Sequence, residues 1–418
     1  MSLAKMASVD YLVDHVAGGD GRGGEVGGSP LTRYYTAEGY PPGTWLGSGM
    51  AALGAIDRAG SEVTEQQLRA LFEDARNPFT GERLGRPPAK YPTRRERIDK
   101  RIAKMPDTLT AEARAGLIEK ITSEEKETRT RTAVAGFDLT FSVPKSISAL
   151  WAIAPADVQE HLYLAHRAAL SATLELIETE AVFTRLGHNG ARRVHAGGLV
   201  AAAFDHWDSR KGDPQLHTHV TVANRVQGPD GRWRTLDGAT LHQAAVAYSD
   251  TYDLLLADEV TRRTGLTWGP RERQAGSNRR LGRELVPVPD SLIAAFSQRS
   301  ADIEAAVDTA IAQVVLRTGR RPDTNAINRI RQHLTLATRD RKHAPNLAES
   351  VAQWRTTATG VLEQDPTTWA TAITTTTTTV DAANLPGAPI WPTRTRRPSR
   401  CVSSTPSRPP GPPGPGGT

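Results

Sequence analysis

Short alternating stretches and longer helical ones divide this chain of 418 residues. The strictest alternation runs over residues 136–143, where the apolar side chains share one face of a strand and Asp138, Thr140 and Ser142 share the other. Residues 182–225 favour a run of antiparallel strands. Because one face of such a sheet packs on a core, we expect the polar face, with Asp138, to line a cleft.

Helix-start residues and helical periodicity predict helices before and after these strands. The predicted helices cover residues 64–75, 110–128, 155–180, 241–264, 300–316, 323–338 and 346–364. Strands and helices in this order predict an α+β fold, with a central antiparallel sheet and helices packed on one side of it.

The end of the chain has a different composition. A run of six threonines, 374–379, precedes a segment at 386–418 that is rich in Pro, Gly, Ser and Arg and has too little apolar surface to fold. We therefore expect a core at residues 1–300, a helical C-terminal extension of that core at 301–365 and a disordered, low-complexity tail at 366–418.

Three histidines form the most informative pattern. His217 and His219 stand two residues apart in a predicted strand, so both side chains point to the same face. The preceding strand ends at His206, and the short polar connection would fold it back and bring the three imidazoles together. Three neutral imidazoles with an open coordination position suit a divalent metal that polarises a substrate oxygen. The residues alone make zinc the first candidate without fixing the metal.

Two further residue types fit such a site. Asp138 is placed to orient one imidazole through its other ring nitrogen. The adjacent Tyr34 and Tyr35 offer phenols, which become useful nucleophiles only beside a base or a cation. The residues leave open a packing role for the tyrosines and a merely solvated position for Asp138.

The chain resembles the conjugative relaxases of the TraI/TrwC (MobF) type, single-strand DNA nicking enzymes of the HUH endonuclease superfamily. The resemblance rests on GFDLTFSVPKSIS (136–148), on FDHWDSRKGDPQLHTHVTVANR (204–225) and on the early Tyr34-Tyr35-Thr36. It departs from the family at a second tyrosine pair, where only Tyr40 is present, and in a longer stretch at 76–132.

The resemblance implies a relaxase fold and metal-dependent, site-specific nicking of DNA through a 5′-phosphotyrosyl intermediate, the step that starts conjugative plasmid transfer. Tyr34 would be the nucleophile, Tyr35 a second candidate, and Asp138 would interact with a histidine and help activate the tyrosine. The metal would be a divalent ion, Mg²⁺ or Mn²⁺ with Zn²⁺ as the alternative, held by His206, His217 and His219. Expected partners are single-stranded DNA at an origin-of-transfer-like site and accessory relaxosome and coupling proteins.

Composition agrees with these expectations. The net charge of +6 and pI of about 9.5 favour an anionic partner. A single cysteine, Cys401, excludes an intrachain disulfide and fits the cytoplasm, and no apolar stretch is long enough to insert in a membrane. No GxxxxGK[S/T] phosphate loop is present, so a fused helicase is not expected, and the altered composition at the end suggests a truncated or frame-shifted gene.

Three alternatives stay open from the residues. The chain could be a non-catalytic remnant that binds single-stranded DNA, or a rolling-circle replication initiator that shares the chemistry. It could also be a hydrolase whose metal activates water, with Tyr34 in a structural role only.

Overall fold

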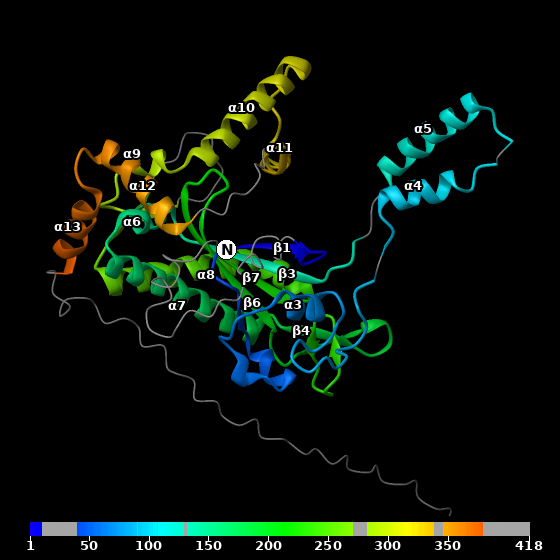
Figure 1. Cartoon of the computed structure of the whole chain (residues 1–418), viewed down its shortest axis with the longest axis horizontal. Helices are drawn as coiled ribbons and strands as arrows, with labels where there is room; N and C mark the ends of the chain where they lie inside the picture. Colours follow the sequence, from blue (N-terminus) through cyan, green and yellow to red (C-terminus); the bar gives the residue numbers. More distant parts are fainter. Residues whose placement is uncertain are drawn as a thin grey trace, which may run out of the picture. The chain divides into compact units, whose positions relative to one another are not determined.

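Five antiparallel strands form the central sheet, in the order β1–β3–β7–β6–β2 (Figure 1). Their bounds are Ser2–Met6 for β1, Thr44–Leu46 for β2, Gly136–Ser142 for β3, Ala201–Asp208 for β6 and Pro214–Ala223 for β7. Strands β3, β7 and β6 are each paired on both edges, so hydrogen bonds fix the cross-strand position of nearly every side chain on them.

The structure is a computed structural model. It describes residues 1–10, 40–89, 91–106, 108–128, 132–270, 282–337 and 346–378, with the backbone alone at 336–337 and 375–378. All of these residues belong to one compact unit. Among the helices described, none combines the length and the apolar composition needed to cross a membrane.

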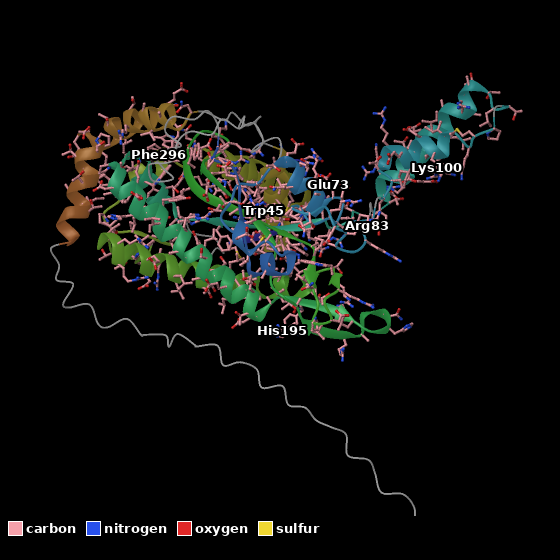
Figure 2. The ribbon with its side chains drawn as sticks, turned by 60° about the horizontal axis from the view of Figure 1, so that its bottom comes forward. Trp45, Glu73, Arg83, Lys100, His195 and Phe296 are labelled. Atoms are coloured by element: carbon pink, nitrogen blue, oxygen red, sulfur yellow. The ribbon has the colours of Figure 1, made fainter. Side chains whose placement is uncertain are left out.

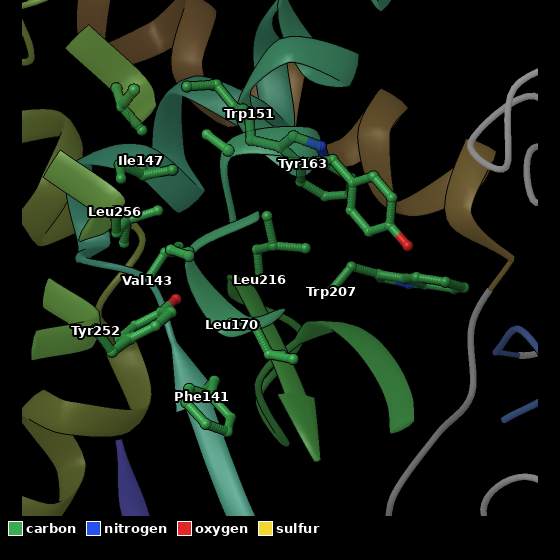
Figure 3. Close-up of a cluster of buried hydrophobic side chains, with 14 of the residues drawn as sticks. Phe141, Val143, Ile147, Trp151, Tyr163, Leu170, Trp207, Leu216, Tyr252 and Leu256 are labelled. Carbon is green, nitrogen blue, oxygen red and sulfur yellow. The ribbon is translucent and has the colours of Figure 1, made fainter. Parts of the chain in front are cut away.

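Three helices cover one face of the sheet: α6 (Lys145–Ile153), α7 (Ala156–Glu180) and α8 (Gly238–Thr264). The apolar side chains between them and the strands form the larger hydrophobic core (Figure 3). At its centre Phe141 of β3 packs edge-on against Tyr252 of α8, with ring centres 5.2 Å apart. This is the helical layer that the alternation of β3 predicts.

A smaller core occupies part of the opposite face. Trp45 of β2 (labelled in Figure 2) and Phe204 of β6 are fully buried there with apolar residues of α3 (Glu65–Phe72). Gly136 of β3 lets the ring of Phe72 approach the sheet, since a Cβ at this position would lie 2.7 Å from that ring. The rest of this face carries polar side chains of β3, β6 and β7.

The other elements precede, connect or follow these layers in the chain. The helices are α4 (Arg94–Ile102), α5 (Ala111–Glu127), α9 (Asp290–Ala295), α10 (Gln298–Thr318), α11 (Thr324–Ala337), α12 (Leu347–Leu362) and α13 (Pro366–Thr378), with 3-10 turns η1 (Ser48–Leu53), η2 (Ile56–Arg58) and η3 (His188–Gly190). The short strand pairs are β4 (Phe183–Leu186) with β5 (Arg192–His195), β8 (Val226–Gln227) with β9 (Trp233–Arg234) and β10 (Trp268–Pro270) with β11 (Arg283–Leu285).

The predicted α+β class is confirmed, and every predicted helix corresponds to a helix of the structure. Two of the helices that periodicity does not predict, α6 and α4, have clear physical reasons. Helix α6 is buried on every side from Ser146 to Ile153, so it lacks an amphipathic period. Helix α4 begins with a capping box, in which Thr93 and Glu96 each accept a hydrogen bond from the other's backbone N–H, within a stretch that reads only as basic.

The structure corrects the predicted start of the tail at residue 366. Helix α13 continues to Thr378, and its Ala370 is fully buried in the larger core. The hydroxyls of Thr371 and Thr374 donate back to carbonyls one turn earlier, those of Thr367 (2.9 Å) and Ala370 (3.0 Å), so the helix leaves neither hydroxyl unsatisfied. The remainder of the predicted tail, from residue 379, lies outside the described residues.

Ending the chain at Asp365 should therefore destabilise it. The loss of α13 uncovers the sites of Trp369, Ala370 and Ile373, and we expect the free energy of unfolding in urea to fall by roughly 2–4 kcal/mol. A chain ending at Thr379 keeps α13 and is the matched control. Equal stability of the two shortened chains would contradict the packed role of α13.

His166 of α7 is fully buried against the sheet. Its two ring nitrogens lie 2.7 Å from the hydroxyls of Tyr252 and Thr218. Burial disfavours the charged imidazolium and lowers the pKa of His166 from 6.5 to about 4.

This burial predicts a dependence of stability on pH. The unfolded chain binds the His166 proton more tightly than the folded one, so the free energy of unfolding should fall by roughly 3 kcal/mol as the pH drops from about 6.5 to about 4. Urea unfolding at several pH values measures it. In His166→Gln the free energy of unfolding should change much less with pH over this range. His161→Gln, at an exposed position of the same helix, should keep the dependence on pH. The same slope in His166→Gln would contradict the assignment.

Candidate metal centre

Three imidazoles converge on the polar face of the sheet. The rings of His206, His217 and His219 are 5.1, 5.1 and 5.2 Å apart pairwise, centre to centre. One nitrogen from each ring lies within 4.8 Å of the other two. Three imidazole nitrogens grouped in this way are a donor set that fits a metal with nitrogen ligands.

Cross-strand pairing explains the convergence. His206 of β6 is directly opposite His217 of β7, and Phe204 is opposite His219. The register shifts just beyond His206. One residue of β6, Trp207, lies opposite two residues of β7 before Asp208 pairs with Pro214. Such a bulge twists the end of the hairpin and is a common way to aim side chains at a site.

Hydrogen bonds fix the tautomers of two of the histidines. Nδ1 of His217 lies 2.8 Å from the carbonyl oxygen of Gln215, which only accepts, so this nitrogen carries the proton. Nδ1 of His219 lies 2.9 and 3.0 Å from the two carboxylate oxygens of Asp138 and donates to them for the same reason. In both rings Nε2 therefore holds the lone pair that a metal needs.

Tyr40 packs beside this centre. The centre of its ring lies 4.5 Å from the ring centre of His206 and 4.8 Å from that of Trp207. Its hydroxyl donates a hydrogen bond to Asp208. Burial, together with the negative charge of Asp208, raises the pKa of Tyr40 well above its usual range. Its phenol therefore stays protonated, which suits a wall of the site and not a nucleophile.

The histidines lie in a cleft of about 740 Å³. Residues 4–8, from the end of β1 and the two positions after it, line one side, and Arg299 and Thr335 line another. Arg210 and Arg299 are cationic members of the lining, and Asp138 and Asp208 are its acidic members. Both carboxylates are engaged, Asp138 by His219 and Asp208 by the hydroxyl of Tyr40, so the two cations and an ion on the histidines would suit an anionic substrate.

The predicted site residues have three outcomes. The structure brings His206, His217 and His219 together and places Asp138 against His219. Tyr34 and Tyr35 lie outside the described residues.

Tyr40 and Asp208 belong to the site but were not predicted as part of it. Asp208 stands two residues after His206, so strand alternation was a usable signal for its face. The approach of Tyr40 to that face depends on the tertiary fold and had no local signal.

Comparison with known proteins gives this chain a family. Residues 5–361 match the model of the TrwC relaxase family, so the chain belongs to that family. It is 43% identical over 101 residues to the multifunctional conjugation protein TraI of Escherichia coli, and 41% identical over 101 residues to TraI of strain K12. Each match covers 24% of this chain and 6% of the relative, so it spans only a small part of either TraI protein.

The fold is also that of solved relaxase structures. The metal-free complex of conjugative relaxase TrwC with OriT DNA superposes with a TM-score of 0.56 at 23% identity, over 88% of this chain and all of that one. The metal-bound complex gives a TM-score of 0.55 at 24% identity over the same 88% of this chain and all of that one. At these identities the likeness shows a shared fold.

Removing one imidazole should abolish tight metal binding. His217→Ala deletes a ligand, and we expect Mn²⁺ affinity measured by calorimetry to fall roughly 100-fold or more, because losing even an outer hydrogen bond costs about 10–100-fold. His195→Ala, at an exposed position on β5, is the control. Unchanged affinity in His217→Ala would show that the three histidines are not the ligands.

Proposed function

We propose that this chain is a site-specific endonuclease and transesterase for single-stranded DNA. It nicks an origin-of-transfer-like sequence through a 5′-phosphotyrosyl intermediate and so starts the transfer of a mobile DNA element. The observation that carries the proposal is the convergence of three imidazoles, oriented in part by Asp138, inside a cleft that Arg210 and Arg299 help to line. Membership of the TrwC relaxase family supports the reaction class.

The reaction exchanges one phosphate ester for another. The Tyr34 oxygen attacks the scissile phosphorus, a phosphorus–oxygen bond to tyrosine forms, and the bond to the 3′ oxygen breaks. The phenol loses a proton and the departing 3′ oxygen gains one, so charge and bond number are conserved. Because the new ester keeps the energy of the old one, the step is reversible and the same site can rejoin the ends.

The residues of the centre divide the remaining tasks. His206, His217 and His219 would hold a divalent ion, whose positive charge would stabilise the negative charge that develops on the phosphate. Asp138 keeps the proton of His219 on Nδ1 and holds the ring in place. Arg210 and Arg299, in the lining of the cleft, are proposed to attract the flanking phosphates.

We propose Mn²⁺ or Mg²⁺ as the working ion, with Zn²⁺ as the alternative. Imidazole donors suit Zn²⁺ best, whereas Mg²⁺ and Mn²⁺ prefer oxygen ligands, which the phosphate and water would supply at the open coordination positions. Cleavage assays with each ion after chelation therefore decide between them. Plasmid DNA in the cytoplasm is the proposed substrate, and accessory relaxosome and coupling proteins are its proposed partners.

The nucleophile can be tested by covalent trapping. Tyr34→Phe removes the attacking oxygen, so protein-linked DNA should disappear from a denaturing gel, while binding of the oligonucleotide stays within about twofold. Tyr35→Phe should reduce the adduct less. Tyr40→Phe removes the hydrogen bond to Asp208 and should still form the adduct.

Three results would contradict the proposal in different ways. An equal adduct yield from Tyr34→Phe would move the nucleophile elsewhere. Free 5′-phosphate ends without any adduct would favour a hydrolase in which the metal activates water. Tight DNA binding without cleavage under any metal would favour a non-catalytic remnant.

A further inference from the structure

A chain of buried hydrogen bonds lies on the far side of β7 from the metal centre. It runs from Tyr252 of α8 through His166 of α7 and Thr218 of β7 to Asp205 of β6. Thr218 and His166 are completely buried and Tyr252 is fully enclosed as well. Tyr163 of α7 adds a second hydroxyl, 2.8 Å from Asp205 (both tyrosines are labelled in Figure 3).

The donor and the acceptor of each hydrogen bond in this series follow from Asp205, the carboxylate at its end. The carboxylate of Asp205 only accepts, so the hydroxyl of Thr218 donates to it. That hydroxyl has a single proton, so it accepts from Nε2–H of His166 at 2.7 Å. Nδ1 of His166 is then the acceptor for the hydroxyl of Tyr252, also at 2.7 Å. His166 is thereby held as one neutral tautomer.

The charge at the end of the chain is compensated. Burial alone would raise the pKa of Asp205, but Arg167, 3.2 Å away, and the hydroxyls of Thr218 and Tyr163 outweigh it and keep the pKa below its usual value. A half-buried carboxylate with these donors holds its geometry tightly, since moving any donor leaves part of its charge unsatisfied.

The position of Thr218 connects this series of hydrogen bonds to the strands that carry the three histidines. Thr218 stands between His217 and His219 and points to the opposite face of the sheet. Its partner across the strands is Asp205, which immediately precedes His206. The side-chain bond from Thr218 to Asp205 therefore joins the two strands at the level of the three imidazoles, and His166 ties that junction to α7 and α8.

We propose that the Tyr252–His166–Thr218–Asp205 chain positions the metal-binding histidines through the backbone of β6 and β7. This inference rests on the proposed metal centre. None of the four side chains belongs to the set of ligands, so their effect is to fix the rotation of β7 and its register against β6. A purely structural role would lower stability without changing metal affinity.

Thr218→Val tests the inference, because it keeps the shape of the side chain and removes the hydroxyl. We expect Mn²⁺ affinity measured by calorimetry to fall about 10-fold, the lower end of the effect of outer partners on metal sites. The visible spectrum of bound Co²⁺ should change as well, since it reports the ligand geometry. Thr218→Ser restores the hydroxyl and should restore both.

Thr221→Val is the matched control. Thr221 is also completely buried on β7 and its hydroxyl donates to the carbonyl of Ala202 at 3.1 Å, so this variant loses one buried hydrogen bond of the same strand. Its melting temperature should fall while Mn²⁺ affinity stays within about twofold. Tyr252→Phe removes the far end of the chain and should weaken Mn²⁺ binding less than Thr218→Val.

The outcomes separate the two claims. Equal Mn²⁺ affinity in the unaltered chain and in folded Thr218→Val overturns the positioning role and leaves the metal centre intact. If Thr218→Val does not fold, Tyr252→Phe decides, and affinity within about twofold of the unaltered chain overturns the inference. Failure of the unaltered chain to bind Mn²⁺, Zn²⁺ or Co²⁺ overturns the metal centre and this inference together.

Discussion

The pairing of β6 with β7 is the constraint on which the site depends. Because side chains alternate along both strands, one register places His206, His217 and His219 on one face and Asp205 with Thr218 on the other. A slip of one residue would bury the imidazoles in the larger core and turn its apolar residues to the cleft. The hydrophobic core and the metal centre are thus specified by the same hydrogen bonds.

Electrostatics divide the two faces of this hairpin. On the cleft side, the carboxylate of Asp138 accepts a hydrogen bond from His219 and that of Asp208 accepts one from Tyr40. The cations of the lining can then attract phosphates. On the core side, Asp205 is enclosed with its own donors. Because the charge of Asp205 is satisfied by donors on the core side, the two strands are held in place there. The cleft on the other face can then stay open to an anion.

The sequence was most informative where local periodicity and tertiary position agree. Alternation in β3 and the spacing of His217 and His219 predicted the sheet, its polar face and the three imidazoles, because a strand fixes direction over two residues. It gave no signal for α6, which has no period because it is buried all round, and it was wrong for the start of the tail, because α13 forms there and packs Ala370 into the core. The contact of Tyr40 with His206 likewise joins segments that only the complete fold brings together.

The central claim is that three imidazoles hold a single divalent ion. Anomalous scattering from a crystal of this protein grown with Zn²⁺ tests it most directly. The account predicts one strong peak, about 2.0–2.1 Å from a nitrogen of each of His206, His217 and His219, with Nε2 as the ligand atom in the latter two. A peak bound to other residues, or none at this cleft with Zn²⁺ in excess, would contradict it.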